Sequence, residues 1–303
     1  MSTAVVIPVH DGAGQITRTI DAVLGQSTPP AEVVVVDNGS TDATAEVARR
    51  AGARVVHEGR RGSYAARNAG VAATTSDTIA FTDADCVPDP GWVAAIERAF
   101  ARDVAIDVVG GPVVAPIVRT ASERWAEARH VLDQQRSWEA PSFLPFFATA
   151  NAAWRRAALE RIGGFDAALA SGGDVDACWR LQRVGGHLAF APDAVVIHAH
   201  RARVGDLLAQ QHRYALGHGR LDGRWSSDPA YVSAAGTAAA RLRAVWLLPA
   251  RVPWRAVRRR DPAIAVLDAL VRTTHEVGRR RGRRQPPLDP MPAAGPPRTP
   301  ATT

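Results

Sequence analysis

Two aspartates that end an apolar segment are the first candidates for chemistry in this sequence. Asp83 and Asp85 belong to the run IAFTDADC, residues 79–86, whose first residues have the pattern of a buried strand. In extended backbone, residues two apart point to the same side, so both carboxylates would face one point. Like charges so close repel each other unless a positive charge lies between them. The pair therefore predicts a site for Mg²⁺ or Mn²⁺, which prefer oxygen ligands; the alternative is a solvated turn.

Further aspartates stand where a ligand could reach them. Asp37 follows the β-branched run 33–36, and it either forms a turn with its own backbone or accepts hydrogen bonds from a nucleoside across the strand ends. Asp174 and Asp176 follow Gly172-Gly173. They could cap a helix, or one of them could act as a general base at the mouth of a pocket.

Two histidines end a later apolar run, HLAFAPDAVVIHAH, at positions 198 and 200. A single histidine in such a place is usually structural. His198 and His200 lie at i and i+2 near a suspected metal, and neutral imidazole is a good ligand for Mn²⁺-type ions, so a ligand role is favoured. The sequence has neither GxGxxG nor GxxxxGK[ST], which disfavours a dinucleotide-binding Rossmann site and a P-loop.

The elements that must position these side chains alternate between strand and helix in the first half. Strands are expected at 4–9, 33–36, 53–58 and 79–82, with helices after each of them. This rhythm predicts an α/β fold with a doubly wound, mostly parallel sheet. Such sheets bind ligands beyond the carboxyl ends of their strands, where Asp37, Asp83 and Asp85 would lie.

The second half is less regular. It predicts a strand over 104–114, a helical segment over 119–139, a helix over 155–162, one strand ending at His200, and only helices beyond residue 201. An aromatic and proline-rich segment, PSFLPFFATANAAW, leads into the helix over 155–162.

Composition excludes several classes of protein. The 303 residues have room for a sizeable core, and their two cysteines make neither a disulfide framework nor a metal-ligand spacing, so a cytoplasmic setting is expected. No signal-peptide pattern and no apolar run of membrane-spanning length is present. The net charge of +7 is uneven: residues 241–303 hold 14 arginines against four acids. Without zinc-finger spacing or RNP-like aromatics, nucleic acid is not an expected partner.

Several stretches occur in a characteristic order between about residues 3 and 201: VVIPVHDGAGQITRTIDAVLGQS, EVVVVDNGSTDAT, GSYAARNAGVAATTSDTIAFTDADC, NAAWRRAALERIGGFD, GGDVDACWRL and FAPDAVVIHAH. In this order they resemble the family-2 glycosyltransferases, which have the GT-A fold. The resemblance implies transfer of a sugar from a nucleotide-diphosphate donor to an acceptor hydroxyl, with inversion at the anomeric carbon. A UDP-sugar donor and a role in cell-envelope glycan or glycolipid synthesis are favoured.

The resemblance also implies roles for individual residues. The donor is assigned to Pro8, Val9, Asp37, Arg67 and Asp83, and the Mg²⁺ or Mn²⁺ ion to Asp85, Asp83 and His198. Asp174 matches the family's catalytic base, whereas Asp176 lies inside the expected helix and points away from it. One departure is that the family often has Glu-Asp where this chain has Gly173-Asp174, so the acidic neighbour of the base is absent.

The expected partners are a nucleotide-sugar donor and a glycan, lipid-linked or small-molecule acceptor. Two alternatives remain open from the sequence. One is a non-catalytic nucleotide- or carbohydrate-binding homologue, motivated by Gly173, and the other is a sugar-nucleotide pyrophosphorylase on a similar scaffold. The pyrophosphorylase lacks support because the chain has no glycine- and lysine-bearing N-terminal loop.

The expected organisation is a nucleotide-sugar-binding half over 1–115, an acceptor and catalytic half over 116–220, a basic helical extension over 221–284 and a disordered tail over 285–303. In the extension, residues 241–260 mix tryptophan and leucine with arginine. Ile264, Leu267, Leu270 and Val271 then precede the run GRRRGRR. Apolar residues on one face and arginines on the other predict a helix on the surface of an anionic membrane. Packing of these helices on the catalytic domain is the alternative.

Overall fold

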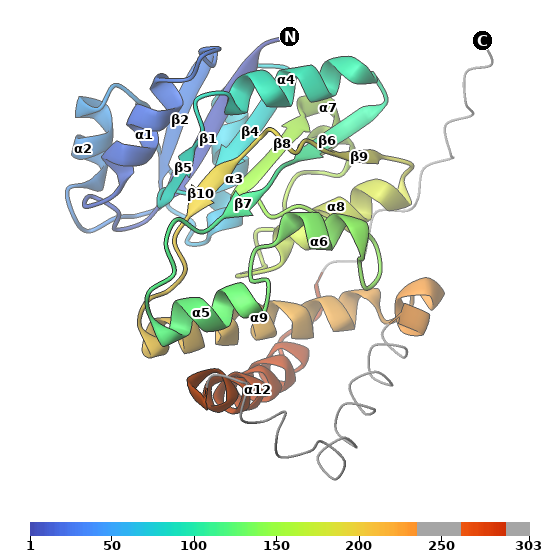
Figure 1. Cartoon of the computed structure of the whole chain (residues 1–303). Helices are drawn as coiled ribbons and strands as arrows, with labels where there is room; N and C mark the ends of the chain where they lie inside the picture. The colour runs from blue at the N-terminus through green and yellow to red at the C-terminus, as the bar shows by residue number, and fades with distance from the viewer. Residues whose placement is uncertain (235–261, 289–303) are drawn as a thin grey trace.

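A seven-stranded sheet forms the centre of the molecule in a computed structural model that describes residues 1–234 and 262–288 (Figure 1). The strand order is β3-β2-β1-β4-β8-β6-β9. The strands are β1 (Thr3–Val9), β2 (Glu32–Asp37), β3 (Arg54–His57), β4 (Thr78–Thr82), β6 (Ile106–Gly110), β8 (Asn151–Arg155) and β9 (His187–Phe190). All neighbours pair in parallel except β8, which runs antiparallel to both β4 and β6. The mostly parallel α/β sheet is therefore confirmed.

Helices cover both faces of this sheet (Figure 1). One face carries α1 (Ile16–Leu24), α2 (Thr44–Arg50) and α4 (Trp92–Arg102), and the other carries α3 (Ser63–Ala72), α7 (Arg156–Arg161) and α8 (Gly173–Arg183). A small second sheet, β5-β10-β7, consists of β5 (Cys86–Pro88), β10 (Val196–His198) and β7 (Val113–Val114). Away from the sheet lie α5 (Ala121–Ala128), α6 (Gln134–Glu139), α9 (Val204–Trp225) and α12 (Pro262–Arg283).

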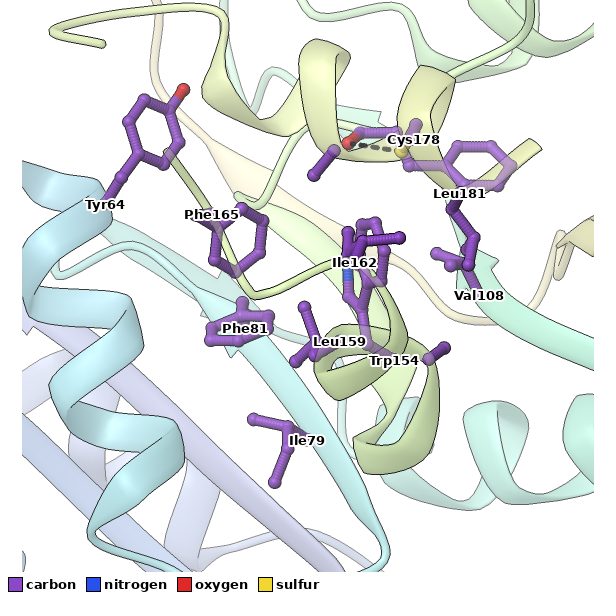
Figure 2. Close-up of a cluster of buried hydrophobic side chains, with 14 of the residues drawn as sticks. Tyr64, Ile79, Phe81, Val108, Trp154, Leu159, Ile162, Phe165, Cys178 and Leu181 are labelled. Atoms are coloured by element: carbon purple, nitrogen blue, oxygen red, sulfur yellow. Dashed lines mark hydrogen bonds between the residues drawn. The ribbon is translucent and has the colours of Figure 1, made fainter. Parts of the chain in front are cut away.

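The alternation of side chains along β1 builds two separate apolar layers. Val5 and Ile7 belong to the layer under α1 and α4, whereas Ala4 and Val6 belong to the layer under α3 and α7. All residues of β1 are buried, as expected for a strand covered on both faces. Figure 2 shows the second layer, in which aromatic rings pack edge-to-face around Phe165. Each large buried side chain contributes about 1.5–3 kcal/mol to stability.

The second half of the chain differs from its prediction in three places. The expected strand over 104–114 divides into β6 and β7, which belong to different sheets, and the helical segment over 119–139 divides into α5 and α6. The expected strand ending at His200 is two strands, β9 and β10, again in different sheets. A proline or glycine at each division between strands, Gly111-Pro112 and Pro192, interrupts the sheet hydrogen bonds.

The sequence pattern does not predict strand β8. Its sequence, NAAWR, is short and rich in alanine, so it carries neither alternation nor β-branched residues. Its place in the sheet is instead fixed by Asn151, whose amide donates to the carbonyls of Pro112 and Ala194 and accepts from the Trp92 indole. Tertiary hydrogen bonds thus override a weak local preference.

The C-terminal helix α12 packs closely against α9. A side chain at Gly282 would overlap the carbonyl oxygen of Leu216, and one at Gly219 would overlap that of Arg279. The run GRRRGRR therefore contains a glycine pair, Gly278 and Gly282, that lets two helix backbones approach. Between and after the glycines, Arg279 and Arg283 bind the Asp222 carboxylate of α9.

The apolar face of α12 is covered by the protein. Leu267 and Val271, two of the residues expected on a membrane surface, are buried against Trp125 of α5 and Leu207 of α9. Asp268 accepts a hydrogen bond from the Trp125 indole and ion-pairs with Arg129. Helix α9 also runs continuously through position 220, the expected domain boundary. Residues 241–261 and 289–303, which carry the rest of the tail predictions, lie outside the described residues.

No helix in the described part of the chain is long and apolar enough to cross a membrane.

We predict that the glycine contact between α9 and α12 is a source of stability. Gly282→Ala should lower the free energy of unfolding by about 1–3 kcal/mol, because a methyl group would overlap the α9 backbone. Gly223→Ala is the matched control: this glycine lies on α9 with open space around it, and alanine there should add up to about 1 kcal/mol through helix propensity. Urea unfolding measures both. Equal effects of the two substitutions would contradict the packing.

Candidate active site

A cavity of about 710 Å³ opens at the carboxyl ends of β1 and β4. It is bounded by the N-terminal half of the sheet, the loop before α8, and α9 with α12. Seven of the predicted site residues line it: Pro8, Val9, Arg67, Asp83, Asp85, Asp174 and His198. Ligand binding at this edge of the sheet is the position expected for a doubly wound fold.

Asp83 and Asp85 lie in a turn rather than in extended backbone. The Cys86 amide donates to the Asp83 carbonyl at 3.0 Å, which closes the turn between β4 and β5. The expectation that the two residues share an extended strand is therefore wrong. Both nevertheless line the cavity, because the turn itself faces it.

Arg67 is the partner of Asp83. Its guanidinium lies 2.5 Å from the Asp83 carboxylate and is almost completely buried. Burial raises the pKa of Asp83, the charge of Arg67 opposes this, and the charge of Asp85 raises the pKa further. The Nε atom of Arg67 finds no partner among the described residues. The buried guanidinium of Arg67 therefore neutralises Asp83, one of the two neighbouring acids.

Asp85 is held by two other groups. His198 Nε2 lies 3.4 Å from its Oδ2 atom, and Arg201 donates to the same oxygen at 3.2 Å. Burial acts to raise the pKa of Asp85, but the hydrogen bond and charge of His198 and the charge of Arg201 outweigh it and lower the pKa to about 2. The carboxylate is thus ionised at neutral pH and available to a cation.

The residues around Asp85 fit a divalent ion. Ligand atoms of Asp85, Cys86 and His198 all lie within 4.8 Å of one another. Burial raises the pKa of the Cys86 thiol well above its ordinary value, so the thiol stays protonated and the oxygen and imidazole ligands remain. His198 Nδ1 is buried without a partner in the described part of the chain. A carboxylate with an imidazole is a donor set suited to Mn²⁺.

The second histidine does not belong to this cluster. His200 pairs with Glu127 of α5 at 3.2 Å and faces a separate, smaller cavity. Only His198 meets Asp85, because the β10 strand ends at that residue.

Asp174 is positioned at the start of α8 by hydrogen bonds from Tyr64, Thr149 and the Val175 amide. The Tyr64 hydroxyl donates to its Oδ1 atom at 3.0 Å, and the Thr149 amide donates to its Oδ2 atom at 3.1 Å. Burial, together with the charge of Asp174, raises the pKa of Tyr64 well above its ordinary value, so the phenol remains a donor. The carboxylate keeps further lone pairs for a ligand.

Gly173 makes this arrangement possible. A Cβ atom there would lie 2.7 Å from the Tyr64 ring, closer than side chains tolerate. The Tyr64 ring therefore fills the space that a side chain at position 173 would need, which is a structural reason for glycine there. The sequence patterns did not identify Tyr64 or Thr149 as site residues. The only available signal for Tyr64 was its spacing of three residues from Arg67, which places both on one face of α3.

Asp176 has a different environment. It is fully buried, and its carboxylate binds Arg180 at 2.8 Å, Arg224 at 2.7 Å and the Trp225 indole at 3.2 Å. It does not line the cavity. This network links α8 to α9. The Asp176 carboxylate thus has structural partners.

Asp37, which is assigned to the donor, also lies outside the cavity lining. It is buried at the end of β2, where it accepts hydrogen bonds from the Ser40 amide and His57 Nδ1, both at 3.0 Å. The next residue, Asn38, does line the cavity. Its amide group is anchored to the carbonyls of Glu58 and Arg60.

Comparison with known sequences gives one family. The model of glycosyl transferase family 2 matches residues 4–163. Glycosyltransferase AglE of Haloferax volcanii is 34% identical over 226 residues, which cover 71% of this chain and 72% of AglE. The pre-mycofactocin glycosyltransferase of Mycobacterium tuberculosis H37Rv is 33% identical over 218 residues. These cover 69% of this chain but only 45% of that protein, so the chain spans about half of its length.

Solved structures agree with this assignment. The mannosyltransferase PcManGT from Pyrobaculum calidifontis, in complex with GDP-Man and Mn²⁺, superposes with a TM-score of 0.62 at 25% identity, over 92% of this chain and 85% of that one. Glucosyl-3-phosphoglycerate synthase from Mycobacterium tuberculosis, with Mn²⁺, UDP and phosphoglyceric acid, gives 0.54 at 25% identity over 73% and 77%. With its motifs, its fold and its relatives in agreement, the chain belongs to glycosyl transferase family 2.

Proposed function

We propose that this protein is a metal-dependent, inverting glycosyltransferase that moves a sugar from a nucleotide-diphosphate donor to an acceptor hydroxyl. The observation that carries the proposal is that the Asp85–His198 pair and Asp174 line one cavity at the strand ends of a family 2 chain. The presence of Mn²⁺ and a nucleotide sugar in PcManGT supports the same chemistry.

In this proposal the ion is Mg²⁺ or Mn²⁺, held by Asp85 and His198 with Asp83 beside them. When bound, such an ion neutralises the diphosphate and stabilises the charge that builds on the leaving nucleotide. Arg67 and Arg201 then supply fixed positive charge on the same side of the cavity. Preorganised charge of this kind lowers the barrier without reorganisation at the moment of reaction.

Asp174 acts as the general base. It removes the proton of the acceptor hydroxyl, whose oxygen forms a bond to the anomeric carbon as the bond to the nucleotide diphosphate breaks on the opposite face. The Tyr64 hydroxyl and the Thr149 amide hold the carboxylate in one orientation for this step. A single displacement of this kind inverts the anomeric centre.

The nucleoside end of the donor is assigned to Pro8, Val9 and Asn38, which line the cavity beside β1 and β2. Asp37 contributes through the lone pairs that Ser40 and His57 leave free. A UDP-sugar is our first choice, and GDP-mannose is included in the test because PcManGT binds it.

Attachment to an anionic membrane surface is proposed through the outward strip of α12, defined as Val266, Leu270, Val277, Arg280 and Arg281 of the helix with Arg284 directly after it. These residues recur at intervals of three, four or seven, so they share one side of the helix, opposite the side buried on α9. The three apolar members are 43–60% exposed. Figure 1 shows α12 at the edge of the molecule farthest from the sheet. The acceptor would then belong to cell-envelope glycan or glycolipid synthesis.

We predict that turnover requires the metal and Asp85. Release of the nucleotide from UDP-glucose, UDP-galactose, UDP-N-acetylglucosamine or GDP-mannose should be seen with Mn²⁺ or Mg²⁺, should stop in EDTA and should return with excess metal. Asp85→Asn should lower turnover by about two orders of magnitude, as expected for loss of a transition-state electrostatic contact. Asp193→Asn, at an exposed acid outside the cavity, is the control. Full activity in EDTA would refute the metal requirement.

We predict opposite effects at the two acids of α8. Asp174→Asn should abolish transfer while donor affinity and the melting temperature stay close to those of the wild type, because only the base is lost. Asp176→Asn should lower the melting temperature, since breaking a buried ion-pair network costs about 3–5 kcal/mol, while the folded fraction stays active. An active Asp174→Asn variant beside a stable, inactive Asp176→Asn variant would reverse the assignment.

We predict that the outward strip of α12 mediates membrane binding. Vesicles containing phosphatidylglycerol should co-sediment the full chain at low salt and less of it at high salt, because salt screens the arginines. The variant Val266→Ser, Leu270→Ser, Val277→Ser should co-sediment less. The control, Val104→Ser with Ile117→Ser, removes two exposed apolar side chains elsewhere. Deleting α12 is a poor test, because it would also uncover α9. Equal sedimentation of both variants would contradict the role of α12.

A further inference from the structure

One wall of the cavity comes from the C-terminal helices rather than from the sheet. We call it the α9–α12 wall, and it consists of Gln210, Gln211, Arg213, Tyr214, His218 and His275. It faces the same space as the acids at the strand ends but contains no acidic side chain itself. The acidic residues that line the cavity therefore all come from other elements.

We propose that the α9–α12 wall binds a phosphate group carried by the acceptor, with Arg213 as its cation. The inference rests on the proposed transferase function, since it names the acceptor class for the same cavity.

Arg213 differs from the other arginines of the cavity. Arg67 is paired with Asp83 and Arg201 with Asp85, while Arg61 donates to His10 and to the Gly39 carbonyl. Arg213 forms no hydrogen bond or ion pair within residues 1–234 and 262–288. A guanidinium carries fixed donors that match phosphate oxygens in pairs.

Gln211 is a buried amide on the side of α9 that faces α12. Its side chain is 4% exposed, and its Oε1 atom meets His275 Nε2 at 2.9 Å. In this arrangement His275 Nε2 donates and the amide oxygen of Gln211 accepts. The Nε2 group of Gln211 then has no partner in the described part of the chain. This amide points to a different side of α9 from Arg213, two positions away, so it would meet a part of the ligand other than the phosphate.

The rest of the wall is neutral. Burial lowers the pKa of His275 to about 4 and also lowers that of His218, so both imidazoles are uncharged at neutral pH. Burial raises the pKa of Tyr214 to about 12, and its hydroxyl stays protonated. Arg213 is thus the charged group of the wall, and the Tyr214 hydroxyl can donate beside it. A phosphate, with three oxygens that accept several hydrogen bonds at once, suits this set better than a neutral hydroxyl.

The wall is held against the loop that carries the proposed base. A side chain at Gly217 of α9 would overlap the carbonyl oxygen of Ser171, so helix and loop are in direct contact. The charge of Asp174 contributes to the pKa values of both Tyr214 and His218, after the larger effect of burial. A phosphate on Arg213 would therefore hold an acceptor within the same cavity as Asp174.

Binding of phosphate to the full chain tests the inference without requiring transfer. With the donor side saturated by UDP and Mg²⁺, inorganic phosphate and glycerol 3-phosphate are titrated calorimetrically, with glycerol as the neutral match. Arg213→Met should weaken binding of both anions at least about tenfold, as expected for a charged hydrogen-bonding partner. Arg220→Met is the matched control: Arg220 lies on α9 but outside the cavity.

A lipid arm compares farnesyl phosphate with farnesol. Tighter binding of farnesyl phosphate than of glycerol 3-phosphate assigns the phosphate to a lipid acceptor, and the reverse order assigns it to a water-borne one. The inference would be overturned if glycerol bound as tightly as glycerol 3-phosphate. It would also be overturned if Arg213→Met and Arg220→Met lost the same affinity for the two anions. UDP affinity and melting temperature should be the same in all variants. Failure of the donor screen would count against transferase activity and leave the phosphate titration readable.

Discussion

Crowding of negative charge at one end of the sheet is the constraint on which the site depends. Asp83, Asp85 and Asp174 share one cavity, and like charges raise each other's free energy unless each is given its own partner. The fold supplies those partners from distant segments. Arg67 comes from α3, and Arg201 with His198 from the end of β10. Asp83 and Asp85 thus each have a basic partner, and a divalent cation can join a site whose charges are already fixed in place.

Close approach of backbones is the second requirement. Gly173 lets Tyr64 reach Asp174, Gly217 brings α9 against the loop before α8, and Gly282 brings α12 against α9. Each contact is one that a side chain would prevent. Together they form a continuous path from the C-terminal helix to the proposed base, so packing far from the sheet decides the geometry of the cavity.

The sequence predicts the half of the site that local pattern determines. Buried parallel strands are recognisable because both faces are apolar, and the acids that follow them lie at the carboxyl edge by construction. What it cannot predict depends on contacts across long sequence separations. Tyr64 and Asp174 are 110 positions apart, and β8 is a strand through the bonds of Asn151 rather than through its own residue types. The α9–α12 wall belongs to the same class, since helical periodicity does not say which helix it faces.

The arginines of the C-terminal region have separate roles, which depend on the residues around each of them. Arg279 and Arg283 neutralise Asp222 and fasten α12 to α9, so their charge is structural. The arginines of the outward strip face away from the protein, where fixed partners are few and long-range attraction to an anionic surface is the effect that remains. Arg213 lines the same cavity as the carboxylates but comes from another element. A donor held through acids and an ion and an acceptor held through a guanidinium would thus meet from different walls of the cavity, which favours one orientation of the two substrates.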